Sequence, residues 1–194
     1  MIKSQLTSTL LEHRTEHVVD KMMGHMRKAI KERNFSALAE LTMRDSNQLH
    51  AICMDSFPPI NYLNETSKKI MDLVHRYNGQ MAEKKLAYTF DAGPNAVLIT
   101  KAEWLDDVCA LVEESFKPDD VDSKDWYMFG SVEHYKPEIP PPKIDGFEGP
   151  KCGVKFAIVT QIGRGPYIIE EHFSTNEEQS GSFPWTAAKM WLTN

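Results

Sequence analysis

The sequence predicts an α+β fold in which a small antiparallel sheet is packed with helices. Three observations predict it. Apolar residues recur at helical spacing over 8–79, two short β-prone runs flank a Gly-Pro turn, and residues 154–162 are almost continuously apolar. The chain has 194 residues, of which 41% are hydrophobic, and this is enough for one well-buried domain.

Three helices are expected before the first strand. Apolar side chains repeat about every 3.6 residues across 8–33, which predicts one long amphipathic helix. The second helix is expected to begin with Ser36 as its N-cap and to stop at Pro58. Asn64 is expected to cap the third helix, which ends near Gly79.

The period then changes from helical to extended. Residues 85–91 and 95–100 are expected to form a hairpin-like pair of strands around the Gly-Pro turn. The later elements are expected to be a helix at 102–116, a long surface excursion at 117–150, a central strand at 154–162, a turn at 163–166 and a further strand at 167–169. We assign residues 1–172 to one domain and 173–194 to a tail without predicted structure.

Charge and cysteine usage narrow the class of protein. The 22 basic and 28 acidic residues give a net charge of −6, so nucleic acid is not an expected partner. No apolar run approaches the roughly 20 residues that cross a bilayer, so no membrane span is expected. Cys53, Cys109 and Cys152 are odd in number and widely spaced, which favours reduced thiols and a cytoplasmic protein.

Two histidine patterns resemble fragments of metal sites, and we expect no metal at either. His13, Glu16 and His17 match the H-x-x-E-H pattern of inverted zincins, but no later carboxylate is singled out as a third ligand. A solvated helix face explains this spacing. His50 and Cys53 make an incomplete ligand set, so we expect a packed thiol and a hydrogen-bonded imidazole there.

Asp91 is the strongest local candidate for chemistry. It ends a predicted strand and enters a tight loop in which Gly93 permits close backbone approach, Pro94 fixes the turn, and Asn95 adds a donor and an acceptor. A carboxylate held in this way can act as a general base or orient a ligand. On spacing alone, an aspartate that caps a β-turn fits the residues better.

Asp45, Ser46 and Asn47 interrupt the apolar stripe of the second predicted helix. Such side chains compete with the helical backbone for hydrogen bonds, so three together need a reason. Two interpretations stay open: an exposed or kinked stretch, and a polar face directed toward a site.

Longer stretches of the chain resemble the eukaryotic diphosphomevalonate decarboxylase family. The matching stretches are D-S-N-x-x-H-A at 45–51, DSFPPI at 55–60, YLN at 62–64, AYTFDAGPNAV at 87–97 and V-T-Q-x-G-x-G-P at 159–166, where x marks positions that do not carry the resemblance. The resemblance covers about residues 1–170. Several multi-residue matches in order are far more specific than any short motif discussed above.

The resemblance implies the C-terminal domain fold of the superfamily of galactokinase, homoserine kinase, mevalonate kinase and phosphomevalonate kinase. It implies a complete enzyme that uses ATP and Mg²⁺ to convert mevalonate diphosphate into isopentenyl diphosphate, ADP, phosphate and CO₂. Such an enzyme is a lyase of the mevalonate pathway, which supplies isoprenoid and sterol precursors. The resemblance also implies a homodimer.

The resemblance assigns roles to the loop that follows the first strand. Asp91 falls on the family's catalytic aspartate, which lies near the substrate's tertiary hydroxyl and assists its deprotonation or orientation. Ala92 is implied to lie beside the substrate, and Gly93, Pro94 and Asn95 complete the active-site loop. Phosphorylation of the hydroxyl, loss of phosphate and decarboxylation are the implied steps.

The sequence departs from the family in its length. Family members are about twice as long, and the phosphate-binding loop and substrate-pocket residues of their first half do not occur in these residues. We therefore expect the isolated chain to be inactive and to bind neither ATP nor Mg²⁺ tightly. The alternative is a stand-alone non-catalytic homologue that acts as an interaction or dimerisation module. A missing partner domain predicts an exposed apolar patch, whereas Met22, Met23 and Met26 are expected to pack in the core.

Overall fold

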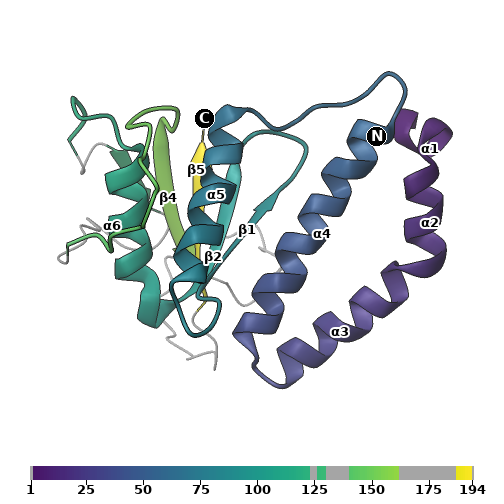
Figure 1. The fold of residues 1–194 in the computed structure, drawn as a ribbon, viewed down its shortest axis with the longest axis horizontal. Helices are drawn as coiled ribbons and strands as arrows, with labels where there is room; N and C mark the ends of the chain where they lie inside the picture. The colour runs from purple at the N-terminus through teal and green to yellow at the C-terminus, as the bar shows by residue number, and fades with distance from the viewer. Residues whose placement is uncertain (1, 123–125, 130–139, 162–186, 194) are drawn as a thin grey trace, which may run out of the picture.

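A computed structural model of the chain describes residues 2–122, 126–129, 140–161 and 187–193 (Figure 1). The helices are α1 (Ile2–Thr7), α2 (Thr9–His17), α3 (Val19–Lys31), α4 (Phe35–Asp55), α5 (Glu65–Gly79), the 3-10 helix η1 (Ala102–Trp104) and α6 (Leu105–Phe116). The strands are β1 (Leu86–Phe90), β2 (Ala96–Lys101), β3 (Tyr127–Phe129), β4 (Phe156–Gln161) and β5 (Ala187–Thr193).

The described strands form one sheet in the order β1-β2-β5-β4-β3. β3 and β4 pair in parallel, and the other neighbouring pairs are antiparallel. α5 and α6 lie against one face of this sheet, and α4 runs beside β1 (Figure 1). The predicted α+β class, with a small and largely antiparallel sheet packed with helices, is confirmed.

The predicted single helix over 8–33 starts where expected but is wrong in its length, because the amino-terminal arm α1–α3 breaks at Val18 into α2 and α3. Ser8 N-caps α2 by accepting a hydrogen bond from the backbone N–H of Leu11. At Val18 the backbone (φ −112°) departs from helical geometry and α3 starts anew. α4 also begins earlier than predicted, because the Asn34 side chain, rather than Ser36, accepts the capping bond from Ala37.

Asp55 fastens the joint between α1 and α2 to the end of α4. One carboxylate oxygen accepts from the Ser8 hydroxyl at 2.8 Å and from the Leu10 backbone N–H at 3.1 Å. Beside it, the Phe57 backbone N–H donates to the Thr7 hydroxyl at 2.8 Å. The Leu10 N–H and the Ser8 hydroxyl hold the pKa of Asp55 below its usual range.

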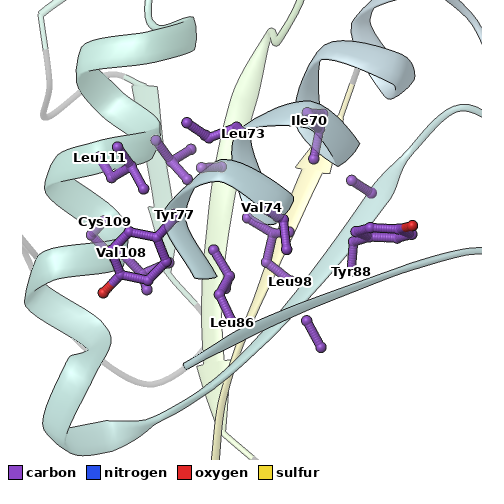
Figure 2. Packing of buried hydrophobic residues seen from close by; sticks show 14 of the residues in the cluster. Ile70, Leu73, Val74, Tyr77, Leu86, Tyr88, Leu98, Val108, Cys109 and Leu111 are labelled. Carbon is purple, nitrogen blue, oxygen red and sulfur yellow. The ribbon is translucent and has the colours of Figure 1, made fainter. Parts of the chain in front are cut away.

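The core lies where α5 and α6 meet the strands (Figure 2). Figure 2 shows Ile70, Leu73, Val74 and Tyr77 of α5 facing side chains of β1, β2 and α6. α5 owes its start to Asn64, as predicted, because Asn64 and Ser67 form a reciprocal capping box. The sequence periodicity of α5 therefore translates directly into a buried face.

The Tyr77 hydroxyl is a polar atom within this core. It has no hydrogen-bond partner among the described residues. Burial, assisted by the negative charge of Asp107, raises the pKa of Tyr77 to about 12. The phenol therefore stays neutral and serves as core packing.

β1 lies at an outer edge of the described sheet, and a side chain from α5 satisfies the free backbone groups at its start. The Asn78 amide nitrogen donates to the Leu86 carbonyl at 2.7 Å, and its oxygen accepts from the Leu86 N–H at 3.1 Å. The Asn78 carboxamide thus takes the place of a neighbouring strand's peptide group. This contact matters because unpaired backbone groups at a sheet edge are costly when buried and invite pairing with other chains when exposed.

The segment predicted as a surface excursion over 117–150 returns to the domain in its described parts. Trp126 is fully buried and its indole N–H donates to the Val154 carbonyl at 3.2 Å. Gly149 lies so close to Ser115 that an added Cβ would sit 2.3 Å from its carbonyl oxygen, so this position requires glycine. These parts of the segment are therefore packed against α6 and β4.

Two later predictions have different outcomes. The central strand is confirmed as β4, which pairs with β5 on one side and β3 on the other. Residues 187–193 form β5, a strand that was not predicted from the sequence. The turn at 163–166, the strand at 167–169 and the domain boundary at 172 lie outside the described residues and stay predictions.

The methionines of α3 do not pack in the core as predicted. Met22 and Met26 are half-buried and Met23 is 49% exposed, because α3 touches the rest of the described chain mainly through α4. Leu6, Leu10 and Ile30 on the same arm are also exposed, at 78%, 44% and 51%. Among the described residues, no helix combines the length and the apolar character that crossing a membrane requires.

We predict that Asp55→Asn weakens the attachment of α1 and α2 near pH 7 but not in acid. The folded-state pKa of Asp55 is lowered, so its stabilising contribution is present above its ordinary pKa and is lost as the pH falls through the folded value. Amide hydrogen exchange at Leu10 measures this: the variant should exchange faster near neutral pH, and the difference should shrink toward pH 3. Asp72→Asn, which removes an exposed pair with Arg76, is the control. A pH-independent difference would contradict the assignment.

Candidate functional site

Asp91 follows the last residue of β1 and opens the loop that joins β1 to β2. Its side chain is exposed, and one carboxylate oxygen accepts from the Ala92 backbone N–H at 3.1 Å. The Gly93 N–H donates to the Asp91 carbonyl at 2.8 Å. The turn-capping geometry favoured by the spacing is therefore present, and it leaves the carboxylate accessible for chemistry.

The first anchor of this loop is Ser46 of α4. Its hydroxyl accepts from the Phe90 N–H at 2.9 Å and donates to the Phe90 carbonyl at 3.4 Å, and Ser46 is only 4% exposed. One hydroxyl therefore satisfies both outward-facing backbone groups of the residue before Asp91. Ser46 does at the end of β1 what Asn78 does at its start.

The second anchor comes from the beginning of α5. The Ser67 hydroxyl, already part of the capping box with Asn64, donates to the Pro94 carbonyl at 3.1 Å. Ser67 is fully buried. The loop from Asp91 to Asn95 is thus held on its first side by α4 and on its second side by α5.

The polar cluster on α4 faces two neighbours. Asn47 accepts from the buried Tyr88 hydroxyl at 3.0 Å, so with Ser46 it forms a polar face toward β1. On the α2 side, Arg14 pairs with Asp45 at 2.5 Å and also donates to Gln48. α4 runs unbroken from Phe35 to Asp55, and the interpretation as a polar face directed toward the candidate site is the one that this geometry supports.

Tyr88 extends this polar contact across β1 to α5. Its hydroxyl lies 3.1 Å from Nε2 of His75. Because the hydroxyl hydrogen is donated to Asn47, the imidazole must donate its Nε2–H to the phenolic oxygen. Burial raises the pKa of Tyr88, and the bond to Asn47 partly offsets this effect.

His50 and Cys53 are both buried, one turn apart on α4. The predicted packing of Cys53 is confirmed, and burial raises the pKa of its thiol. The expected hydrogen-bonded histidine needs correction at one atom: Nε2 of His50 has no hydrogen-bond partner among the described residues. Burial lowers the pKa of His50, whereas the Phe90 backbone and the negative charge of Asp91 act to raise it.

His13 and His17 share one exposed face of α2, with ring centroids 5.0 Å apart. Within the described part of the chain, no group of three or more histidine, cysteine, aspartate or glutamate side chains comes together. Arg14, between the two histidines, instead pins α2 to α4. We derive no metal chemistry from these residues.

We predict that Ser46→Ala costs about 1–3 kcal/mol of unfolding free energy, because two buried backbone groups of Phe90 lose their partner. Urea denaturation of the chain measures the loss. Ser36→Ala on the same helix is the matched control, since the Ser36 hydroxyl makes one 3.3 Å bond, to the Lys84 N–H. An equal loss in the two variants would argue against a special role for Ser46.

Comparison with known proteins places these features in a family. Residues 1–169 match the family described as the mevalonate 5-diphosphate decarboxylase C-terminal domain. The diphosphomevalonate decarboxylase of Rattus norvegicus is 42% identical to this chain over 174 residues, and that of Homo sapiens is 43% identical over 172 residues. These alignments cover 88% and 85% of this chain but 42% and 41% of the relatives, so the chain spans about two fifths of their length.

Solved structures agree with this placement. Mevalonate diphosphate decarboxylase from Trypanosoma brucei superposes with a TM-score of 0.62 at 35% identity, covering 66% of this chain and 33% of that one. A structure of mevalonate diphosphate decarboxylase from Enterococcus faecalis, solved in a study of ATP binding mediated by mevalonate diphosphate, superposes with a TM-score of 0.55 at 23% identity. The match covers 59% of this chain and 35% of that one. That second likeness supports the fold alone. The match over 169 residues shows that the chain belongs to the mevalonate 5-diphosphate decarboxylase family, within its C-terminal domain.

Proposed function

We propose that this chain supplies the C-terminal half of an ATP-dependent diphosphomevalonate decarboxylase. The observation that carries the proposal is the loop from Asp91 to Asn95, which presents an exposed carboxylate from a backbone anchored on both sides. The complete enzyme would convert mevalonate diphosphate and ATP into isopentenyl diphosphate, ADP, phosphate and CO₂. This reaction would provide precursors for isoprenoids and sterols.

In this proposal Asp91 is the catalytic residue. Its carboxylate would orient the tertiary hydroxyl of the substrate or take up its proton as the hydroxyl is phosphorylated. Positioning and charge stabilisation supply most of the catalysis in phosphoryl transfer, so a rigidly held carboxylate suits the task. Ala92 would lie beside the substrate, with Gly93, Pro94 and Asn95 shaping the loop around it.

ATP and Mg²⁺ are proposed as cofactors of the complete enzyme rather than of these residues. Among the described residues, no group of three or more histidine, cysteine, aspartate or glutamate side chains is arranged to hold a metal ion. A homodimer and a cytoplasmic location likewise stay predictions from the resemblance and from the cysteine usage.

We predict that Asp91→Asn lowers turnover by about 10²-fold or more, because the amide keeps the shape of the loop but loses the charge and basicity of the carboxylate. The measurement is CO₂ release from mevalonate diphosphate by a fusion of these 194 residues to the remaining part of the rat relative. Asp119→Asn, an exposed carboxylate beyond α6, is the control. Near-normal turnover in Asp91→Asn would make Asp91 a structural turn residue.

A second candidate function is a non-catalytic interaction or dimerisation module. The exposed apolar side chains near the joint of α1 and α2, where Leu6 is 78% exposed and Phe57 is 80% exposed, fit such a module, and a missing first half predicts them as well. The hydrogen bond between Thr7 and Phe57 brings these two segments together. Exposed apolar groups of this size are typical of surfaces that meet another protein or domain.

One assay separates the two candidates. We predict that the purified chain alone neither releases CO₂ from mevalonate diphosphate nor binds ATP tightly, and that adding the separately expressed first half of a family member restores turnover. Turnover by the chain alone would overturn the proposed division of labour. If the added half binds the chain but restores no turnover, the interaction module becomes the better account.

A further inference from the structure

His50 lies between the two anchors of the Asp91 loop. Its ring makes edge contacts with Phe90 and with Tyr62, each with a centroid distance of 6.3 Å. Phe90 is the residue whose backbone Ser46 holds, and Tyr62 precedes the Asn64 cap of α5, whose Ser67 holds Pro94. The His50 ring therefore joins the two supports that enter the loop from opposite sides.

Packing alone does not explain why a histidine occupies this buried position. It is 7% exposed, and its Nε2 has no hydrogen-bond partner among the described residues. Leaving a buried polar atom unpaired destabilises the fold, so a phenyl ring of similar size would fill this place at lower cost. An unsatisfied buried group of this kind calls for an explanation.

The charge of Asp91 supplies one. Burial has the largest effect and lowers the pKa of His50, whereas the negative charge of Asp91 acts in the opposite direction, so the imidazole lies within the electrostatic reach of the loop. Ser46 and His50 are one helical turn apart on the same face of α4 and both contact Phe90. Phe90 is thus held at its backbone by one residue and at its ring by the other.

We propose that His50 is a positioning residue for Asp91: its imidazole, in contact with Phe90 and Tyr62, ties together the two anchors of the loop. This inference rests on the proposed function of Asp91 and deepens it. His50 touches neither substrate nor cofactor in this role. It acts through Phe90 and Tyr62, the ring neighbours that connect it to the two anchors.

The first test uses the chain as it is. The imidazole of His50 is titrated by NMR in the native chain, in Asp91→Asn and in the control Asp119→Asn. Removing the Asp91 charge should lower the pKa of His50 further, because that charge acts to raise it, whereas the control should leave the titration in place. Identical His50 titrations in the native chain and Asp91→Asn would overturn the proposal.

The second test separates positioning from packing. In the fusion enzyme, His50→Phe keeps a ring but removes both nitrogens, and should lower kcat by about tenfold to a hundredfold while KM stays nearly unchanged. His50→Gln, which keeps a side-chain N–H, should recover part of the loss. Thermal unfolding of each variant checks that the fold survives. Unchanged kcat in a folded His50→Phe enzyme would overturn the inference.

The two failures are distinguishable. If Asp91→Asn retains turnover, both the proposed catalytic role of Asp91 and the positioning role of His50 are wrong. If Asp91→Asn loses turnover while His50→Phe does not, the inference about His50 alone is wrong. If the native fusion shows no turnover, the NMR titration on the chain decides the proposal by itself.

Discussion

The fold depends on how the outer edge of β1 is satisfied. An edge strand carries backbone N–H and C=O groups that have no strand partner on one side, and these groups need partners when they are buried. Here the partners are two helical side chains, Asn78 at Leu86 and Ser46 at Phe90. Each side chain binds both the N–H and the C=O of one residue, so α5 and α4 take the place of a neighbouring strand at the two ends of β1.

This arrangement determines where the candidate catalytic group lies. Asp91 follows the residue that Ser46 holds, and the far side of its loop is bound by Ser67 at the start of α5. The position of the loop is therefore set by buried serines of two helices, while the carboxylate itself stays exposed. An accessible group on a rigid backbone is what phosphoryl transfer requires of a base or an orienting residue.

Local signals predicted much of this from the sequence, and non-local contacts account for what was missed. Asn64 correctly predicted the start of α5, and the Gly-Pro turn correctly predicted the hairpin of β1 and β2, because both features act within a few residues. Ser46 drew attention as a polar residue in an apolar stripe, but its partner lies 44 residues away in the sequence, so two interpretations stayed open. Periodicity alone also could not place the break at Val18, where a change in backbone angle divides the arm into α2 and α3.

β5 could not be predicted from the pattern of apolar residues. Its seven residues carry no clear alternation, and their place between β2 and β4 follows from pairing with two strands distant in the sequence. The unpaired Nε2 of His50 also could not be predicted from the sequence, because its burial depends on Tyr62 and Phe90 meeting the His50 ring in the folded chain. Chemistry-bearing residue types can be named from a sequence, whereas their partners come from the tertiary fold.

Amide hydrogen exchange at Phe90 in the native chain tests the central claim most directly. If Ser46 replaces a strand partner at this edge, the Phe90 N–H should exchange as slowly as the amides that pair β1 with β2, although it points away from β2. Rapid exchange at Phe90, with the paired amides of β1 still protected, would contradict the account and leave the Asp91 loop without its first anchor.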